Sequence, residues 1–127
     1  MEGNERREDK SRDIRDRTFN FSVKVVQLCQ QLNKRPGVTR MLVGQLLRAG
    51  TSIGANIEEA QAGQSRADFV SKYSIALKEA RETIYWLRLL RECDNGVDND
   101  CQQLLEESGE ISRIIGRIIV NAKKGKP

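Results

Sequence analysis

The stretch TSIGANIEEA, residues 51–60, holds the side chains of this chain that come closest to a reactive group. Thr51 and Ser52 offer hydroxyls for nucleophilic attack, and Glu58 with Glu59 offers paired carboxylates for metal binding or proton transfer. Histidine usually supplies the base or the further ligand for such sites, and the chain has no histidine. Adjacent helical residues also point about 100° apart, so the two glutamates diverge. We therefore expect no enzyme, no metal site and no cofactor.

The segment GTSIG, residues 50–54, is similar to a phosphate-binding loop, but no strand precedes it and no Gly-Lys-Ser/Thr ending follows. Gly50 and Gly54 are four residues apart, so on a helix they would leave a groove for a neighbouring helix. Each costs the helix about 1 kcal/mol relative to alanine, which implies compensating contacts. For Asn56, on an apolar seam, we favour setting helix register over ligand binding. The candidate packing and assembly residues are Gly50, Ser52, Ile53, Gly54, Asn56 and Ile57.

Apolar residues recur at helical spacing along nearly the whole chain and predict four helices. Pro36 with Gly37 ends the first helix, and Asn95 with Gly96 ends the third. Gly63 suits the position after the second helix, Ser65 with Asp68 forms a capping box for the third, and Asp98, Asn99 or Asp100 would cap the fourth. The predicted helices span about residues 12–33, 39–62 and 66–93, and a fourth runs from its cap at residues 98–100 to about residue 122.

The second helix carries two adjacent stripes of apolar or small residues, which predicts burial on two sides. Because short connections join antiparallel neighbours, the expected fold is an all-α, up-down-up-down antiparallel four-helix bundle. The length of 127 residues fits one domain. We expect a flexible charged lead-in at residues 1–12, the bundle at residues 13–122 and a basic flexible tail at residues 123–127.

The net charge of +4 is concentrated in the middle of the chain and permits, without requiring, nucleic-acid binding. Tyr85 and Trp86 could stack on bases, although aromatic residues near a helix seam more often pack in a core or interface. Several cations have acidic residues four positions away, such as Lys78 with Glu82, so a solvated charged face is the alternative interpretation. The candidate phosphate-binding residues are Arg48, Arg66, Lys72, Lys78, Arg81 and Arg88.

Cys29, Cys93 and Cys101 are odd in number and lack C-x-x-C spacing, which favours reduced thiols in the cytoplasm. No apolar run approaches the roughly 20 residues of a membrane span, and the start MEGNERREDK is charged rather than signal-like. The sequence predicts a cytoplasmic protein with no membrane contact.

Residues 45–90 resemble the four-helix-bundle family of proteins encoded in 23S rRNA intervening sequences. RAGTSIGANIEEA and ADFVSKYSIALKEARET are similar to two family signatures, and the resemblance extends over nearly all of the chain after residue 13. EEAQAG departs from the family's Ala-Glu-Gly followed by basic residues, so a basic contact at that turn is not carried over from the family. It implies a ring-like homopentamer without catalytic residues, and a more distant relation to the accessory variability determinant of diversity-generating retroelements, which works with a reverse transcriptase and RNA.

Together, the resemblance and the basic middle helices predict a non-enzymatic, oligomeric protein that binds RNA or DNA and supports a reverse transcriptase or another ribonucleoprotein. The alternative is a protein-interaction scaffold that makes no contact with nucleic acid. Self-association is expected in both cases.

Overall fold

The computed structural model describes residues 2–63 and 65–125, and every regular element within them is helical. Because the described residues contain no strand, the predicted all-α class with four helices is confirmed. The elements are α1 (Glu2–Leu32), α2 (Val38–Gln61), α3 (Arg66–Cys93), a short 3-10 turn η1 (Asn95–Val97) and α4 (Asp98–Lys123).

The first helix begins at Glu2, ten residues before its predicted start at residue 12. The backbone of the expected lead-in is therefore helical from residue 2, because glutamate, arginine and lysine favour helix nearly as well as leucine does and no proline interrupts them. Met1 lies outside the described residues. At the other end, Lys123 still belongs to α4, and residues 126–127 of the expected tail lie outside the described part.

The helix ends follow local chemistry in two cases and depart from the prediction in a third. Gly37 adopts a φ of 80° before α2, which a residue without a side chain accommodates best. Ser65 caps α3, and its hydroxyl accepts a hydrogen bond of 3.1 Å from the Asp68 N–H, as predicted. The predicted caps of α4 are wrong. Val97 precedes that helix without a side-chain cap, while Asp94 accepts a bond from the Gly96 N–H and starts η1.

One hydrophobic core fills the space between the four helices, and each helix contributes residues mainly at steps of three or four. Both stripes of α2 lie largely in it, because α2 contacts α1 on one side and α3 on the other, which confirms the predicted two-sided burial. The largest fully buried side chains are Tyr73, Phe21, Ile14, Leu32, Leu46, Ile53, Ile57, Leu87, Leu90, Ile111, Ile115 and Val25.

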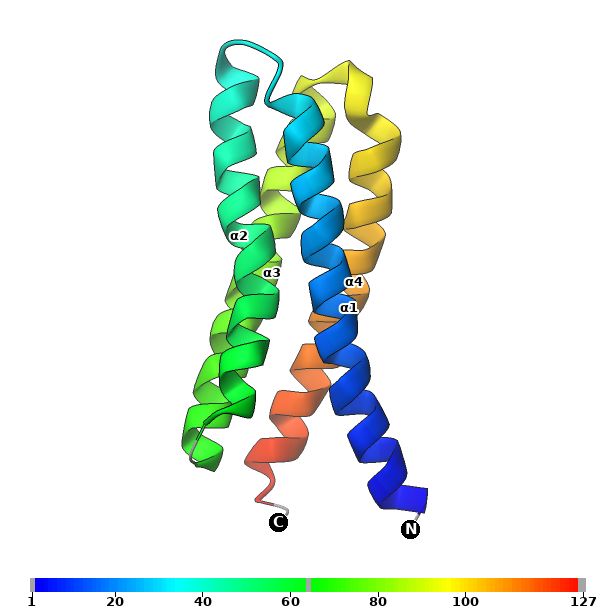
Figure 1. Ribbon diagram of the computed structural model, residues 1–127, viewed down its shortest axis with the longest axis vertical. Helices are drawn as coiled ribbons and strands as arrows, with labels where there is room; N and C mark the ends of the chain where they lie inside the picture. Colours follow the sequence, from blue (N-terminus) through cyan, green and yellow to red (C-terminus); the bar gives the residue numbers. More distant parts are fainter. Residues whose placement is uncertain (1, 64, 126–127) are drawn as a thin grey trace.

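The four helices lie side by side along the long axis of the molecule (Figure 1). The turn between α1 and α2 and the connection between α3 and α4 lie at one end, whereas the start of α1 and the end of α4 lie at the other. At the first end, Arg35 forms an ion pair with the buried carboxylate of Asp94 and so links the two connections. None of the described helices is long and apolar enough to cross a membrane.

Candidate assembly and nucleic-acid site

The two glycines of the GTSIG segment lie where α1 approaches α2 most closely. A Cβ atom added to Gly50 would stand 2.9 Å from Val25 Cγ1, which is too close for an unshifted contact. A Cβ added to Gly54 would stand 3.2 Å from the backbone oxygen of Thr18. The groove expected from the glycine spacing is therefore present, and α1 of the same chain occupies it.

Four of the six candidate packing residues are thus buried inside the protomer. Gly50, Ile53, Gly54 and Ile57 face the core or α1, and the two isoleucines have no exposed surface. The structure brings these residues together, but it leaves them no outward surface on which a second chain could pack. Any assembly of this protein must use other residues of α2 or other helices.

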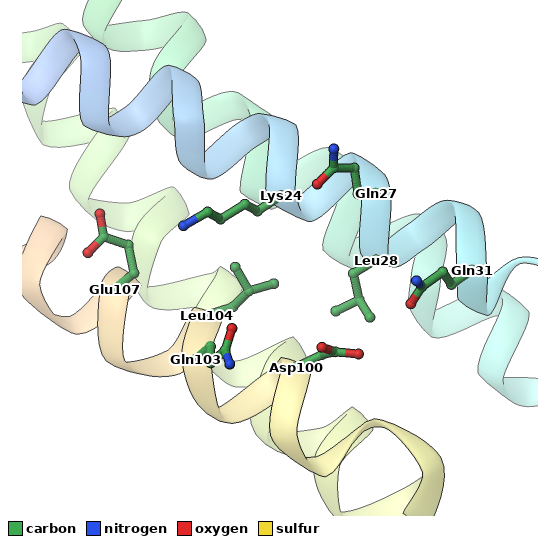
Figure 2. A pocket seen from close by; sticks show the side chains of 8 residues that line it. All are labelled: Lys24, Gln27, Leu28, Gln31, Asp100, Gln103, Leu104 and Glu107. Carbon is green, nitrogen blue, oxygen red and sulfur yellow. The ribbon is translucent and has the colours of Figure 1, made fainter.

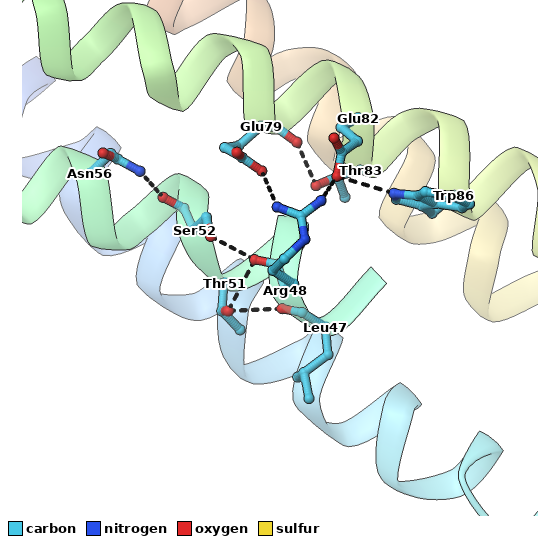
Figure 3. Close-up of polar contacts among 9 residues, drawn as sticks. All are labelled: Leu47, Arg48, Thr51, Ser52, Asn56, Glu79, Glu82, Thr83 and Trp86. Carbon is cyan, nitrogen blue, oxygen red and sulfur yellow. Dashed lines mark hydrogen bonds and ion pairs between the residues drawn. The ribbon is translucent and has the colours of Figure 1, made fainter. Parts of the chain in front are cut away.

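Ser52 and Asn56, the other two candidates, are half-buried and bond to their own helix (Figure 3). The Ser52 hydroxyl donates to the carbonyl of Arg48 at 2.6 Å, and the Asn56 amide donates to the carbonyl of Ser52 at 2.8 Å. Within the described residues these bonds join no second helix, so the expected role of Asn56 in setting the register inside the protomer is not observed. Its half-exposed position removes the need for a buried interhelical partner.

Arg48 links α2 to α3 through two glutamates that are three residues apart (Figure 3). Its guanidinium bonds Glu79 at 3.3 Å and also pairs with Glu82, to which the Trp86 indole N–H donates at 3.2 Å. Both glutamates lie more than 30 residues from Arg48 in the sequence. The spacing of residues within one helix therefore could not predict this cluster. The charge of Arg48 is compensated, which makes it a poor phosphate ligand.

The other five candidate cations fall into two groups. Lys72 pairs with Glu59 of α2 at 3.4 Å, and Arg66 lies beside Gly125 just past the end of α4. Lys78, Arg81 and Arg88 lie exposed on α3 and form no ion pair with any described residue.

These three cations share one outer face of α3, together with Tyr85. Spacings of three, seven and ten residues from Lys78 bring Arg81, Tyr85 and Arg88 onto that face over about 15 Å. The Tyr85 side chain is 56% exposed, whereas Trp86 is half-buried and contacts Tyr85 edge-on. Because Glu82 pairs with Arg48 rather than with Lys78, the three cations keep their positive charges with no ion-pair partner among the described side chains. We call Lys78, Arg81, Tyr85 and Arg88 the α3 stripe.

A second arginine cluster, between α1 and α4, was absent from the sequence prediction. Arg17 bonds both oxygens of Glu107, at 3.1 and 2.6 Å, and Glu110 at 2.6 Å. The hydrogen bonds that Arg17 donates to Glu107 and Glu110 raise the pKa of Arg17 above its ordinary value. Arg113 and Arg117 border the same shallow pocket on α4. In the sequence, only the four-residue spacing of Arg113 and Arg117 indicated that cations share one face of α4. The bonds between Arg17 and the α4 glutamates depend on tertiary packing, which the sequence pattern does not give.

A groove of about 310 Å³ lies between α1 and α4 (Figure 2). Leu28 and Leu104 form its apolar floor, and Lys24, Asp100 and Glu107 are its charged side chains. In Figure 2, Lys24 extends from α1 toward the Glu107 end of the groove, whereas Asp100 lies near the other end, so the charged groups do not converge on a central point. No group of three or more Cys, Asp or Glu side chains suited to a metal ion occurs among the described residues.

Two of the three cysteines are buried in the core. Burial raises the pKa of both the Cys29 and the Cys101 thiol to about 11, so both are neutral at physiological pH. A neutral buried thiol is a weak nucleophile, and both residues behave as small apolar side chains. Cys93 is exposed at the end of α3.

The chain is similar to known proteins over most of its length. The family model described as 23S rRNA-intervening sequence protein matches residues 10–117. A crystal structure of a protein with unknown function from the S23 ribosomal protein family of Bacteroides thetaiotaomicron VPI-5482 has a TM-score of 0.80 and 41% sequence identity. That similarity covers 87% of this chain and 97% of the other. No curated protein matches the chain significantly.

Proposed function

This chain belongs to the 23S rRNA-intervening sequence protein family, and from that membership we propose a non-enzymatic, oligomeric accessory protein that binds nucleic acid. The observation that supports this function is the α3 stripe, with its three exposed cations and exposed tyrosine. Uncompensated lysines and arginines attract phosphates, and a tyrosine beside them offers a surface on which an unpaired base can stack. RNA is the proposed ligand, alone or paired with DNA.

The proposed assembly is a ring-like homopentamer of up-down-up-down antiparallel bundles. The short connections between successive helices and the contacts of α1 with both α2 and α4 support that arrangement of the bundle. Five copies of a chain with net charge +4 would carry +20, and five α3 stripes would act on one nucleic acid together. The distant resemblance to the retroelement determinant suggests a reverse transcriptase as the protein partner, in the cytoplasm, where the thiols stay reduced.

The first test measures binding to a structured RNA at two salt concentrations. We expect binding at low salt that weakens steeply at high salt. The variant Lys78→Gln/Arg81→Gln/Arg88→Gln should bind more weakly. The negative slope of log affinity against log salt should become shallower by about 2 to 3 for each stripe in contact. The matched control Arg113→Gln/Arg117→Gln/Lys123→Gln removes the same charge from α4 and should retain nearly all of the affinity.

Absence of binding at low salt, or an equal loss in both triple variants, would count against this function. A protein-interaction scaffold is the second candidate, and α2 favours it, because this helix is poor in charge on its outer side. Pull-down with and without nuclease separates the two, since a scaffold keeps its partner proteins after digestion whereas an RNA-dependent complex loses them.

A further inference from the structure

The outer side of α2 differs from the outer sides of the other three helices because it is almost free of charge. Between Arg40 and Glu58 the helix contains one charged residue, Arg48, and that residue is paired with glutamates of α3. A helix that faced water along this length would normally carry several charges on its exposed side. The exposed part of α2 therefore has the composition of a packing surface.

Exposed large apolar side chains are concentrated on α2 and on the two helices that contact it. Among the described side chains, seven of the eight belong to α1, α2 or α3, and Val120 is the one on α4. Single exposed apolar residues are ordinary, but a group beside an uncharged helix marks an interaction site. The seven are Phe19, Val23, Val38, Met41, Leu47, Ile75 and Tyr85.

One flank is formed by α1 and α2. Arg15 of α1 pairs with Glu58 of α2, and Phe19 follows Arg15 by one helical turn, so Phe19 lies on the α2 side of α1. Gly54 of α2 contacts α1, and Leu47 precedes Gly54 by seven residues, or two helical turns. Leu47 therefore lies on the α1 side of α2. Phe19 is 67% exposed and Leu47 is 40% exposed. We call Phe19, Val23 and Leu47 the α1–α2 face.

The other flank is formed by α2 and α3. Met41 precedes Arg48 by seven residues, and Ile75 precedes Glu82 by seven. Because Arg48 and Glu82 pair across the two helices, Met41 and Ile75 also lie along that junction. Met41 is 75% exposed, and the half-buried Trp86 lies one turn beyond Glu82. We call Met41, Ile75 and Trp86 the α2–α3 face.

We propose that these faces are the two halves of one contact, in which the α1–α2 face of one copy packs on the α2–α3 face of the next. This inference rests on the proposed homo-oligomer and names its interface. A ring needs a head-to-tail contact between two different surfaces of each subunit, and the two faces are different surfaces of one chain. Ser52 and Asn56, one and two turns beyond Arg48, lie on the α2–α3 side and would border the contact.

Charge favours a second copy as the occupant. The three residues of the α1–α2 face are uncharged. The charged groups of α2 on the side of the other face, Arg48 and Glu59, are both paired with residues of α3. Packing one face on the other therefore buries no unpaired charge, which would be costly. A nucleic acid would instead need exposed cations, and neither face contains one, whereas the α3 stripe contains three.

The available area also fits a subunit contact. A helix of 24 residues is about 36 Å long, and two neighbouring helices present a width of about 20 Å. Each face thus offers up to about 700 Å², close to the roughly 800 Å² per partner of a standard stable interface. The contact leaves the outer side of α4 free.

The test uses two double variants of the full chain, Phe19→Lys/Leu47→Lys and Met41→Lys/Ile75→Lys. Light scattering should give an oligomer for the unaltered protein and a monomer for each double variant, with circular dichroism showing that both remain helical. Val120→Lys, which changes an apolar residue of α4 that is 52% exposed, is the control and should assemble normally. Mixing the two double variants should give a 1:1 dimer, because each retains the face that the other lacks.

The outcomes separate this inference from the proposed function. If the unaltered protein assembles but either double variant keeps its mass, or the mixture stays monomeric, the assignment of the faces is wrong while the oligomer stands. Loss of assembly in Val120→Lys would also overturn it, because the effect would then not be specific to these faces. A monomeric unaltered protein at every concentration would remove both the assembly and its interface.

Discussion

Gly50 shows how one residue decides the distance between two helices. Its missing side chain lets the stiff, β-branched side chain of Val25 rest against the backbone of α2. Helix propensity alone would favour alanine at this position, so the glycine is explained by packing and not by the helix in which it lies.

At this scale we predict that Gly50→Ala lowers the free energy of unfolding by about 1 kcal/mol. The added Cβ meets Val25 at 2.9 Å, and the overpacking cost of about 1–3 kcal/mol outweighs a propensity gain of up to about 1 kcal/mol. Gly116→Ala is the control, since no described atom lies within 4 Å of its added Cβ, and it should stabilise by about 0.5–1 kcal/mol. Urea unfolding measures both, and equal stabilisation of the two would contradict the packing account.

The residue types of the candidate site were readable from the sequence, but their partners were not. The spacing of Gly50 and Gly54 predicted a close helix contact, and α1 makes it. The same reasoning grouped Arg48 with Lys78. Glutamates of α3 neutralise Arg48, whereas Lys78 has no ion pair with a described residue. A hydrogen bond or ion pair between helices depends on their relative register, which periodicity along one helix does not encode.

At the scale of elements, α1 meets α4 less extensively than it meets α2, and Arg17 is the main polar link between α1 and α4. Its guanidinium bonds Glu107 through two nitrogens and Glu110 through one, and the side chains of Arg17 and Glu107 are only 27% and 28% exposed. A bidentate, half-buried arginine–carboxylate ion pair is stronger than an ordinary surface ion pair.

We therefore predict that Arg17→Gln lowers the free energy of unfolding by about 1–2 kcal/mol, because two carboxylates lose a charged donor. Arg113→Gln is the matched control, for Arg113 is exposed and has no ion pair with a described residue, and it should change stability by less than about 0.5 kcal/mol. Thermal unfolding at low ionic strength measures the difference. If the two variants had the same melting temperature, the ion pairs of Arg17 would not stabilise the packing of α1 against α4.

The ends of the elements show where local sequence rules work and where they fail. The Ser65 cap followed from a local pattern, because its donor is three residues away in the same segment. The cap of α4 was misplaced because Asp94 belongs to the connection and also pairs with Arg35 from the other turn. The early start of α1 was missed because charged residues carry no apolar periodicity.

At the scale of the whole molecule, the uncharged outer side of α2 links stability to concentration. If two faces of this chain are buried between copies, the folded state is stabilised by association, and the unfolded chain is not. The melting temperature of the protein should then rise as its concentration rises. In Phe19→Lys/Leu47→Lys the melting temperature should be independent of concentration, as calorimetry over a hundredfold range would show. A constant value in the unaltered protein would argue against association.

The sequence by itself determined the four helices, the positions of the breaks between them and the two-sided burial of α2, because these depend on residues a few positions apart. Only the tertiary structure decided that α1 fills the glycine groove and that Arg48 is neutralised. It also decided that, within the part of the chain that the structure describes, Lys78, Arg81 and Arg88 have no ion-pair partner. These outcomes depend on how far each helix is shifted and rotated against its neighbours. Packing between segments that are distant in the chain sets that register, and local spacing does not contain it.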